Sequence, residues 1–443
     1  MKTLTNRQHI KETIFLSLPL IATQIGHVFT GMADNYFLGQ IGKTELAAGV
    51  FSNGIFVLLL VFCIGMSFAS TPLVSSAHIK SDVERKALLF KNALVLNLIV
   101  SVTAFLLLFF LSPLMVYMGQ EQDVIELAEP FFNVLVFSMI PVSFFFTCKQ
   151  YAEGLSNTRA AMYISIIGNL LNIVLNYCLI YGKCGLPAIG YMGAAWATFI
   201  ARCFMGGAFI WYIFVNPKTN DIKIFFRKVK VGGEALRSLW KIGINTGMQF
   251  TFEVAAFVIA LFMAGTFGKE QIDSHGIAIT LASFTYMFAS GIASASTIRV
   301  SNFKAREDKL GLKRAGNMAV LLVLACMGTF ALIFVLFNNW LPAFFTKDPE
   351  IIGLSSSLLL IAAVFQLFDG LQVTSIGILR GMEDVKFPTY ITLIGYWILA
   401  LPFAYFLGFT CKLEVIGIWW ALTFSLVFVG VILYWRFRKL TRG

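Results

Sequence analysis

The chain has 443 residues, of which 58% are hydrophobic and only 13% are charged, and its mean hydropathy is +0.80. Soluble domains carry about 25% charged residues, so a single soluble core is excluded and the excess apolar surface must face lipid. The formal net charge of +11 does not indicate a nucleic-acid partner, because the cations lie between apolar runs.

Twelve apolar runs along the chain are long enough to cross a bilayer. Each is predicted to be a helix, because a backbone in lipid must satisfy its hydrogen bonds internally. The first run is too long for a signal peptide and lacks a small-residue cleavage site. In chain order the predicted spans are 13–38, 46–72, 90–117, 130–150, 160–181, 189–214, 238–266, 274–298, 315–337, 351–376, 388–408 and 413–436.

The distribution of Lys and Arg predicts the direction of these spans. With the N-terminus in the cytoplasm, 28 of the 34 cations fall in cytoplasmic segments, five fall in outer loops, and Arg202 lies inside a span. Cytoplasmic loops of membrane proteins carry such an excess of positive charge. We therefore expect a multi-pass protein of the cell inner (cytoplasmic) membrane with both termini in the cytoplasm.

The two halves of the chain repeat each other at a nearly constant offset. Gly-x-x-Gly-Lys at 39–43 recurs 226 residues later at 265–269, and Ala-Ser-Thr at 69–71 recurs at 295–297. Six spans is an even number, so both repeats start on the same side of the membrane and are parallel. The predicted fold is therefore all-α, with two pseudo-symmetric six-helix bundles and a central cleft that suits rocking-bundle alternating access.

The domain prediction follows from this repeat. The N-terminal lobe is expected at residues 1–216 and the C-terminal lobe at 238–443. A basic segment at 217–237 joins them on the cytoplasmic side. It is either an amphipathic stretch that lies on anionic headgroups or a solvated loop that only sets topology.

Four ionisable residues fall well within the predicted spans: Asp34, Arg202, Glu253 and Asp369. A charge at the centre of a spanning helix costs about 2.5–3.5 kcal/mol, so such residues are expected to face an internal cavity and mark an ion path. We assign a cation-coupling role to the three acids, although Asp34 could instead satisfy a helix end. Arg202 is either a buried counter-charge or a cation that snorkels toward the interface.

Neutral polar residues accompany these charges. Thr30 shares one helical face with Asp34, and Gln249 lies one turn before Glu253, so both are predicted to line the cavity. Asn172 and Asn176 are four residues apart, and they coordinate a cation with neutral oxygens, brace Asp34 or make interhelical hydrogen bonds.

Histidine and cysteine offer little further chemistry. His27 and His275 are either proton relays or hydrogen-bonded packing residues. The seven cysteines show no metal spacing; five lie in apolar runs, while Cys184 and Cys411 fall in outer loops and could pair in a disulfide. The sequence contains no HExxH motif and no phosphate loop, so we assign no catalytic residue and expect no cofactor other than a coupling ion.

Several of these segments resemble the multidrug and toxic compound extrusion (MATE) transporters. They are the run 18–48 with Asp34 inside it, NIVLNY at 172–177, GAAWAT at 193–198, FEVA at 252–255 and QLFDGLQ at 366–372. The joint placement of the three acids resembles the NorM-like branch of that family.

The resemblance implies efflux of organic, often cationic and aromatic, compounds in antiport with Na⁺ or H⁺. It implies that Glu253 and Asp369 bind the cation, as Na⁺ ligands if the ion is Na⁺. It implies a coupling role for Asp34, with Asn172, Asn176 and Thr198 around it.

Two other functions stay open at this point. One is a lipid-linked precursor flippase of the same superfamily, which would favour a cationic cavity. The other is a membrane-embedded enzyme, for which the chain shows no paired catalytic groups. For partners we expect the lipid bilayer and small organic substrates, with no nucleic acid, and we expect a monomer.

Overall fold

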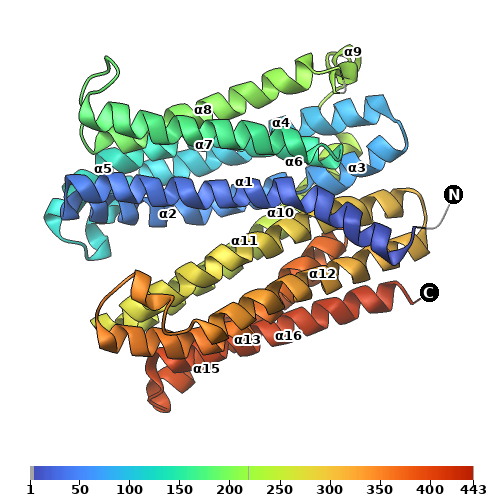
Figure 1. Cartoon of the computed structure of the whole chain (residues 1–443). Helices are drawn as coiled ribbons and strands as arrows, with labels where there is room; N and C mark the ends of the chain where they lie inside the picture. The colour runs from blue at the N-terminus through green and yellow to red at the C-terminus, as the bar shows by residue number, and fades with distance from the viewer. Residues whose placement is uncertain (1–3, 218, 443) are drawn as a thin grey trace. The chain divides into compact units, whose positions relative to one another are not determined.

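The computed structural model describes residues 4–217 and 219–442 of the chain. Within these residues all regular structure is helical, and twelve helical segments are long and apolar enough to cross a membrane (Figure 1). The predicted all-α fold and the number of spans are therefore confirmed, and the chain is a multi-pass membrane protein.

The helices follow one another through short connections, and several spans are built from two or more consecutive helical elements. The first six spans are α1 (Asn6–Ile41), α2 and α3 (Lys43–Ser67, Ser70–Ile79), α4 and η1 (Val83–Leu111, Ser112–Met118), α5 and α6 (Gln122–Phe137, Met139–Gly154), α7 (Thr158–Tyr181) and α8 (Met192–Val215). The last six are α10 (Gly233–Gly265), α11 (Lys269–Ala305), α12 (Lys309–Leu336), α13 (Pro349–Gly381), α14 to η5 (Lys386–Leu393, Ile394–Ala400, Leu401–Tyr405, Phe406–Thr410) and α16 (Glu414–Leu440). Short helices η2 (Asn220–Ile222), α9 (Lys223–Phe226) and η3 (Pro342–Phe344) lie in the connections.

Most helices are longer than the apolar runs that predicted them. Hydropathy detects only the part of a helix that is uniformly apolar, whereas backbone hydrogen bonding carries the helix on through polar residues. Several charged residues at or beyond the ends of the predicted spans therefore lie inside spanning helices. Those of them that are buried include Lys86, Lys149, Glu153, Arg299 and Arg380.

The chain divides into two compact units, each of which combines parts of both sequence halves. The Asp34 unit comprises Ala22–Gly247, and the Glu253 unit comprises the described residues of Met1–Ile21 and Met248–Gly443. These divisions differ from the predicted lobes 1–216 and 238–443. The first part of α1 belongs to the unit formed by the second repeat, and the first part of α10 belongs to the unit formed by the first repeat.

Close helix contacts explain this exchange of helix segments. In the Asp34 unit, a Cβ atom on Gly65 would lie 2.6 Å from the Cα atom of Gly247. In the Glu253 unit, a Cβ atom on Gly291 would lie 2.9 Å from the backbone nitrogen of Ile21. Gly291 follows Gly65 by 226 residues, and Gly247 follows Ile21 by the same number. The two helix crossings are therefore equivalent in the internal repeat. Small residues at such crossings let helix backbones approach closely in membranes.

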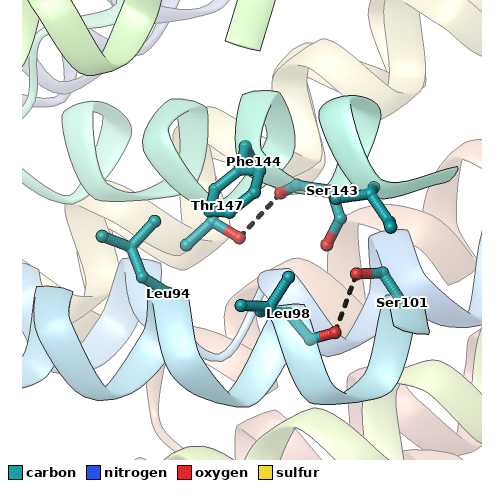
Figure 2. A pocket seen from close by; sticks show the side chains of 7 residues that line it. Leu94, Leu98, Ser101, Ser143, Phe144 and Thr147 are labelled. Carbon is teal, nitrogen blue, oxygen red and sulfur yellow. Dashed lines mark hydrogen bonds between the residues drawn. The ribbon is translucent and has the colours of Figure 1, made fainter. Parts of the chain in front are cut away.

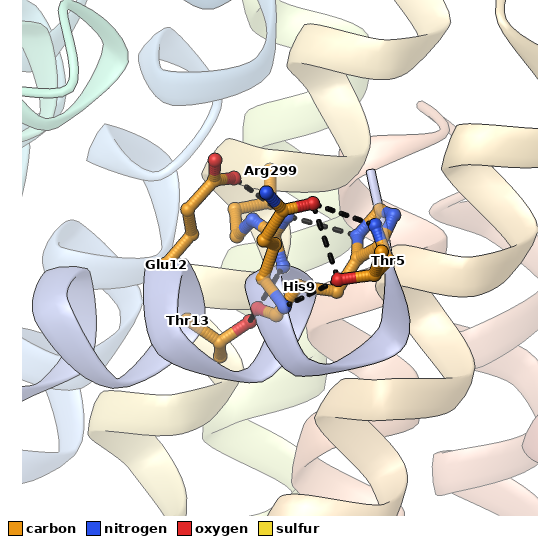
Figure 3. A network of polar contacts seen from close by, with 6 residues as sticks. Thr5, His9, Glu12, Thr13 and Arg299 are labelled. Atoms are coloured by element: carbon orange, nitrogen blue, oxygen red, sulfur yellow. Dashed lines mark hydrogen bonds and ion pairs between the residues drawn. The ribbon is translucent and has the colours of Figure 1, made fainter. Parts of the chain in front are cut away.

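A buried arginine on α11 adds a polar anchor for the first part of α1 (Figure 3). The Arg299 guanidinium donates to the His9 carbonyl at 2.6 Å, to Thr13 Oγ1 at 2.7 Å and to Glu12 Oε2 at 2.8 Å. Its Nη2 also lies 2.9 Å from His9 Nδ1. Arginine presents several donors in a fixed planar arrangement, so one side chain holds a whole helical turn in the Glu253 unit.

Caps and turns recur in the two units at the same offset. Asp82 and Asp308 cap α4 and α12, each accepting a 2.8 Å hydrogen bond from the backbone nitrogen three residues ahead. Ser81 and Glu307, which precede these caps, both have positive φ values, 55° and 58°. A residue in the left-handed region is a common way to end a helix. Because these equivalences span caps, turns and helix crossings, the predicted repeat is also a structural one.

The basic linker packs against α4 in the Asp34 unit. Lys86 pairs with Asp221 at 2.6 Å, and the Lys91 ammonium donates to the carbonyls of Phe226 at 3.1 Å and Val229 at 2.8 Å. The Gly232 backbone nitrogen donates to Asn92 Oδ1 at 2.8 Å. The linker is therefore a folded part of this unit and not a freely solvated loop, while its contact with lipid headgroups stays a prediction.

Substitution of Gly65 by alanine is expected to lower the thermal unfolding midpoint of the purified protein. The added Cβ would meet backbone atoms of Gly247 and Thr246 at 2.6–2.9 Å, and backbone cannot move aside as a side chain can. Overpacking of this kind costs about 1–3 kcal/mol. Gly54 lies on the same helix with no atom within 4 Å of its added Cβ, so Gly54→Ala is the matched control and should be neutral or slightly stabilising. Equal midpoints for the two variants would contradict the tight crossing.

Candidate functional site

The Asp34 carboxylate lies at the centre of a polar cluster formed by α1, α7 and α8. Its Oδ1 accepts a hydrogen bond from Asn176 Nδ2 at 2.6 Å, and its Oδ2 accepts one from Thr198 Oγ1 at 3.3 Å. Asn172 closes the ring: its Nδ2 donates to Thr198 at 3.2 Å, and its Oδ1 accepts from Asn176 at 3.1 Å. The structure therefore brings together four of the predicted site residues.

Small residues bring the three helices close enough for this cluster to form. A Cβ atom on Gly193 of α8 would lie 2.8 Å from the backbone nitrogen of Ile180 on α7. A Cβ atom on Gly26 of α1 would lie 2.6 Å from Asn169 Nδ2 on α7. The short distances between helices allow side chains as short as Asp and Asn to meet directly.

The oxygens of this cluster suit a small cation. The Oδ1 atom of Asn176 is buried and has no hydrogen-bond partner among the described residues. A buried acceptor left without a donor is costly. Carboxylate and amide oxygens are the ligands that hard cations prefer. A monovalent cation beside Asp34 would satisfy this oxygen and neutralise the carboxylate.

Arg202 lies one turn after Thr198 on α8 and is held by groups of the same unit. Its Nη1 lies 2.5 Å from Ser138 Oγ, and the guanidinium lies 4.9 Å from the centre of the Phe56 ring. A guanidinium above an aromatic face is attracted by the ring quadrupole. Arg202 is thus a positive charge inside the Asp34 unit, and no ion pair within 4 Å joins it to a described carboxylate.

The Glu253 unit contains a second polar cluster, formed by α10, α13 and η4. Glu253 Oε1 accepts a hydrogen bond from Gln372 Nε2 at 3.1 Å and lies 3.4 Å from the Tyr396 hydroxyl. The same Gln372 nitrogen lies 2.9 Å from that hydroxyl. Tyr396 belongs to a π-helical segment, a local geometry that recurs at functional sites. Glu253 is only 9% exposed, so water does little to solvate its charge.

Asp369 lies three residues before Gln372 on α13 and is 6% exposed. Its carboxylate makes no hydrogen bond with any residue that the structure describes. It interacts electrostatically with Glu253 and with Tyr286 on α11. Two buried carboxylates in one unit repel each other unless a cation or a proton lies between or on them. This repulsion favours the binding of a cation or a proton in the Glu253 unit.

Four other predicted residues take less central places. Thr30 donates to the Gly26 carbonyl of its own helix at 2.9 Å and is not part of the Asp34 cluster. Gln249 is buried on α10, one turn before Glu253. His275 accepts a hydrogen bond from Trp419 Nε1 at 3.1 Å, as the packing interpretation predicts. His27 packs edge-on against Phe145, and its Nε2 is buried without a partner among the described residues.

Sequence reasoning missed Tyr396 as a partner of Glu253. A tyrosine within an apolar run is more often a packing residue, and nothing in the local pattern distinguishes this one. Its role is apparent only in the structure, where the contact between α13 and η4 brings the Tyr396 hydroxyl close to Gln372 and Glu253. Lys149 and Glu153 were also missed, although an i, i+4 pair of opposite charges directly after an apolar run was a usable signal.

A hollow between α4 and α6 offers no comparable chemistry (Figure 2). Its hydroxyl groups already donate to backbone carbonyls: Ser101 to Leu98 at 3.1 Å, Thr147 to Ser143 at 2.8 Å and Ser143 to Asn97 at 3.2 Å. No ionisable side chain lines it. The two carboxylate clusters are therefore the candidate functional sites.

Comparison with known proteins places this architecture in a family. A model of the MatE family matches residues 19–178 and 246–406, which is well over half of the chain and the larger part of both repeats. The chain belongs to the MatE family. The family resemblance predicted from the motifs around Asp34, Glu253 and Asp369 is thereby confirmed.

Relatives of this MatE protein match it from end to end. A protein of Pseudomonas syringae pv. tomato named "Probable multidrug resistance protein NorM" is 31% identical over 95% of this chain and 93% of its own length. A protein of the same name from Rhizobium meliloti is 28% identical over 98% of this chain and 94% of its own length.

Solved transporter structures share the fold. A MOP superfamily transporter from Pyrococcus furiosus superposes with a TM-score of 0.90 at 19% identity, covering 100% of this chain and 99% of its own. The eukaryotic MATE transporter AtDTX14 gives 0.88 at 17% identity, covering 98% and 96%.

Proposed function

We propose that this protein is a multidrug efflux transporter that exports organic, often cationic, compounds in antiport with Na⁺ or H⁺. The observation that carries the proposal is the presence of a carboxylate cluster within the spanning helices of each unit, part-buried at Asp34 and buried at Glu253 and Asp369. Buried acids in lipid-spanning helices are disfavoured unless they serve an ion or a substrate. The relatives named as multidrug resistance proteins support small organic molecules as the substrates.

The clusters suggest how cation and substrate are exchanged. A cation that binds Asp34, or Glu253 and Asp369, removes negative charge that would otherwise attract a cationic substrate. The cation and the substrate then compete, either for the carboxylates directly or because each favours a different conformation of the protein. Moving one net positive charge down a potential of 100 mV supplies about 2.3 kcal/mol, which drives export only when more positive charge enters with the coupling cations than leaves with the substrate. In a one-for-one exchange with a monovalent cationic substrate, the concentration gradient of the coupling cation supplies the energy. A rocking motion of the two bundles would complete the cycle.

If the coupling ion is Na⁺, its ligands in the Glu253 unit would include neutral oxygens. No group of three His, Cys, Asp or Glu side chains is placed to hold a metal in the described part of the chain. Glu253 and Asp369 would bind Na⁺ together with oxygens such as those of Gln372 and Tyr396. A proton would need only one of the two carboxylates. Whether transport requires both Glu253 and Asp369 therefore distinguishes Na⁺ coupling from H⁺ coupling.

The test is ethidium transport into inverted membrane vesicles that contain the protein. One arm imposes a Na⁺ gradient directed out of the vesicle, another imposes an acidic lumen, and a third imposes neither. We expect one of the two gradients to drive ethidium uptake, and we expect no uptake in the arm without a gradient. Uptake that ignores both gradients would overturn antiport, and binding of anionic lipid without binding of ethidium would favour a lipid flippase.

A further inference from the structure

The basic linker exposes positive charges that no described carboxylate neutralises. Asp221, the acid nearest to them in the chain, pairs instead with Lys86 of α4 at 2.6 Å. None of the exposed cations forms an ion pair within 4 Å with a described carboxylate. The proposed transport mechanism does not use them, so they are available to bind an anion. These four side chains, called the linker cations, are Lys223, Arg227, Lys228 and Lys230.

The packing of the linker against α4 fixes the backbone that carries the linker cations. Ile222 is fully buried and Val229 is 8% exposed, so the apolar side chains of the linker face the protein. The Phe226 ring lies 5.9 Å from the Phe90 ring of α4. The Lys91 ammonium donates to the carbonyls at positions 226 and 229, which satisfies the end of the short helix α9. The linker cations are therefore exposed on a backbone that is already held in place.

The linker lies at the level of the membrane surface, because it joins two spanning helices. The span α8 ends at Val215, and α10 begins at Gly233. Trp211, about one turn before the end of α8, is 67% exposed, and Trp240, about two turns into α10, is 47% exposed. Exposed tryptophans near the ends of spanning helices mark the interface between hydrocarbon and water. The linker cations lie in the segment between these two tryptophans, at the depth of the lipid headgroups.

Two apolar side chains are exposed beside the linker cations. Ile224 is 67% exposed and Val231 is 42% exposed. Water disfavours such exposure, whereas a segment at a bilayer surface can place apolar side chains among the headgroups and acyl chains while its Lys and Arg side chains contact phosphates. A surface that combines free cations with exposed apolar groups suits a lipid better than it suits a free phosphate or a soluble polyanion.

We propose that the basic linker is a binding site for the headgroups of anionic phospholipids. The ligand is a phosphate diester that carries acyl chains, as in phosphatidylglycerol. The linker cations attract its phosphate, and Ile224 and Val231 contact the apolar region next to the headgroup. Anionic lipid surfaces attract basic segments beside spanning helices in this way. The inference does not depend on which ion or substrate the protein transports.

The rate of lysine acetylation in the purified full-length protein tests this proposal. A water-soluble N-hydroxysuccinimide ester modifies exposed lysines, and mass spectrometry gives the rate at each one. The protein is compared in nanodiscs of phosphatidylcholine alone and in nanodiscs in which about a third of the lipid is phosphatidylglycerol. Phosphatidylglycerol should slow the three linker lysines by about threefold or more relative to Lys11 and Lys309, which are exposed outside the linker. Added salt should reduce this difference.

Two double variants with the same change in net charge provide the comparison. Arg227→Gln/Lys230→Gln removes half of the linker cations and leaves the other two as reporters, whose protection by phosphatidylglycerol should fall below about 1.5-fold. Arg7→Gln/Arg306→Gln removes two exposed cations outside the linker and should leave the protection of the linker lysines unchanged. All four substituted side chains are exposed, so both variants should keep the thermal midpoint of the unsubstituted protein.

Equal slowing of the linker lysines, Lys11 and Lys309 would overturn the proposal, because the general surface potential of the bilayer would then explain it. Full protection in Arg227→Gln/Lys230→Gln, or its loss in Arg7→Gln/Arg306→Gln, would overturn it too. A third arm adds soluble glycerophosphoglycerol to the phosphatidylcholine nanodiscs. Protection there as large as with phosphatidylglycerol would show a site for free phosphate esters and would overturn the assignment to a lipid.

Discussion

Asp369→Asn is expected to reduce cation-driven ethidium transport by about a hundredfold while leaving the protein folded. A hundredfold loss corresponds to about 2.8 kcal/mol, comparable to the cost of one charge at the centre of a spanning helix. The buried Asp369 carboxylate makes no hydrogen bond with the described residues and interacts electrostatically with the like charge of Glu253. The amide is nearly the same size and removes this repulsion, so the thermal midpoint should stay equal or rise. Transport and midpoint should therefore move in opposite directions.

The measurement is gradient-driven uptake into inverted vesicles, with the midpoint taken on purified protein. Glu350→Gln is the control, because it makes the same change from carboxylate to amide on an exposed residue of the same helix. It should change neither quantity by a measurable amount. Full transport by Asp369→Asn would remove this residue from the proposed cation site, whatever the behaviour of Glu253→Gln.

Arg299→Met is expected to destabilise the protein by about 2–3 kcal/mol and to impair transport. The guanidinium makes several hydrogen bonds to the first part of α1 (Figure 3), and hydrogen bonds to charged groups contribute about 1.5–3 kcal/mol each. The total stays well below their sum for two reasons. Glu12 is 51% exposed and regains water, and Thr13 keeps its own bond to the His9 carbonyl at 2.9 Å.

The effect on transport follows from the path of α1 through both units. Its first part is fixed in the Glu253 unit by Arg299, and its second part carries Asp34 in the other unit. Freeing the first part should weaken any coupling between the two carboxylate clusters that passes along this helix. Arg299→Lys should not rescue it, because one ammonium cannot replace the planar set of donors.

Thermal unfolding and vesicle transport measure the two effects of Arg299→Met. Arg306→Met, at the end of the same helix, supplies the comparison, since Arg306 makes no side-chain contact of this kind among the described residues. Unchanged midpoint and transport in Arg299→Met would show that the network is incidental. A lower midpoint with normal transport would confine its role to stability.

Residues that sequence reasoning placed correctly are those whose chemistry conflicts with lipid. Bracing of Asp34 by the asparagines was one of the predicted alternatives, and Asn176 does donate to Asp34 and to Asn172, because polar groups in apolar helices have few partners other than one another. Gln249 and Thr30 fit the same pattern by position, yet Thr30 is satisfied by its own helix. Periodicity shows which face a residue occupies and cannot show whether a nearer backbone carbonyl will take its hydrogen bond.

The sequence by itself determined the number of spans, the parallel repeat and the identity of the three acids within the spans. Hydropathy, charge asymmetry and internal similarity can be identified from the sequence without knowledge of any tertiary contact. Only the tertiary structure decided that the first parts of α1 and α10 are exchanged between the units and that Tyr396 completes the Glu253 cluster. It also extended the fourth span to include Glu153, one turn after Lys149. These features depend on which helices cross at glycines and small side chains, and close approach between distant segments leaves no local pattern in the sequence.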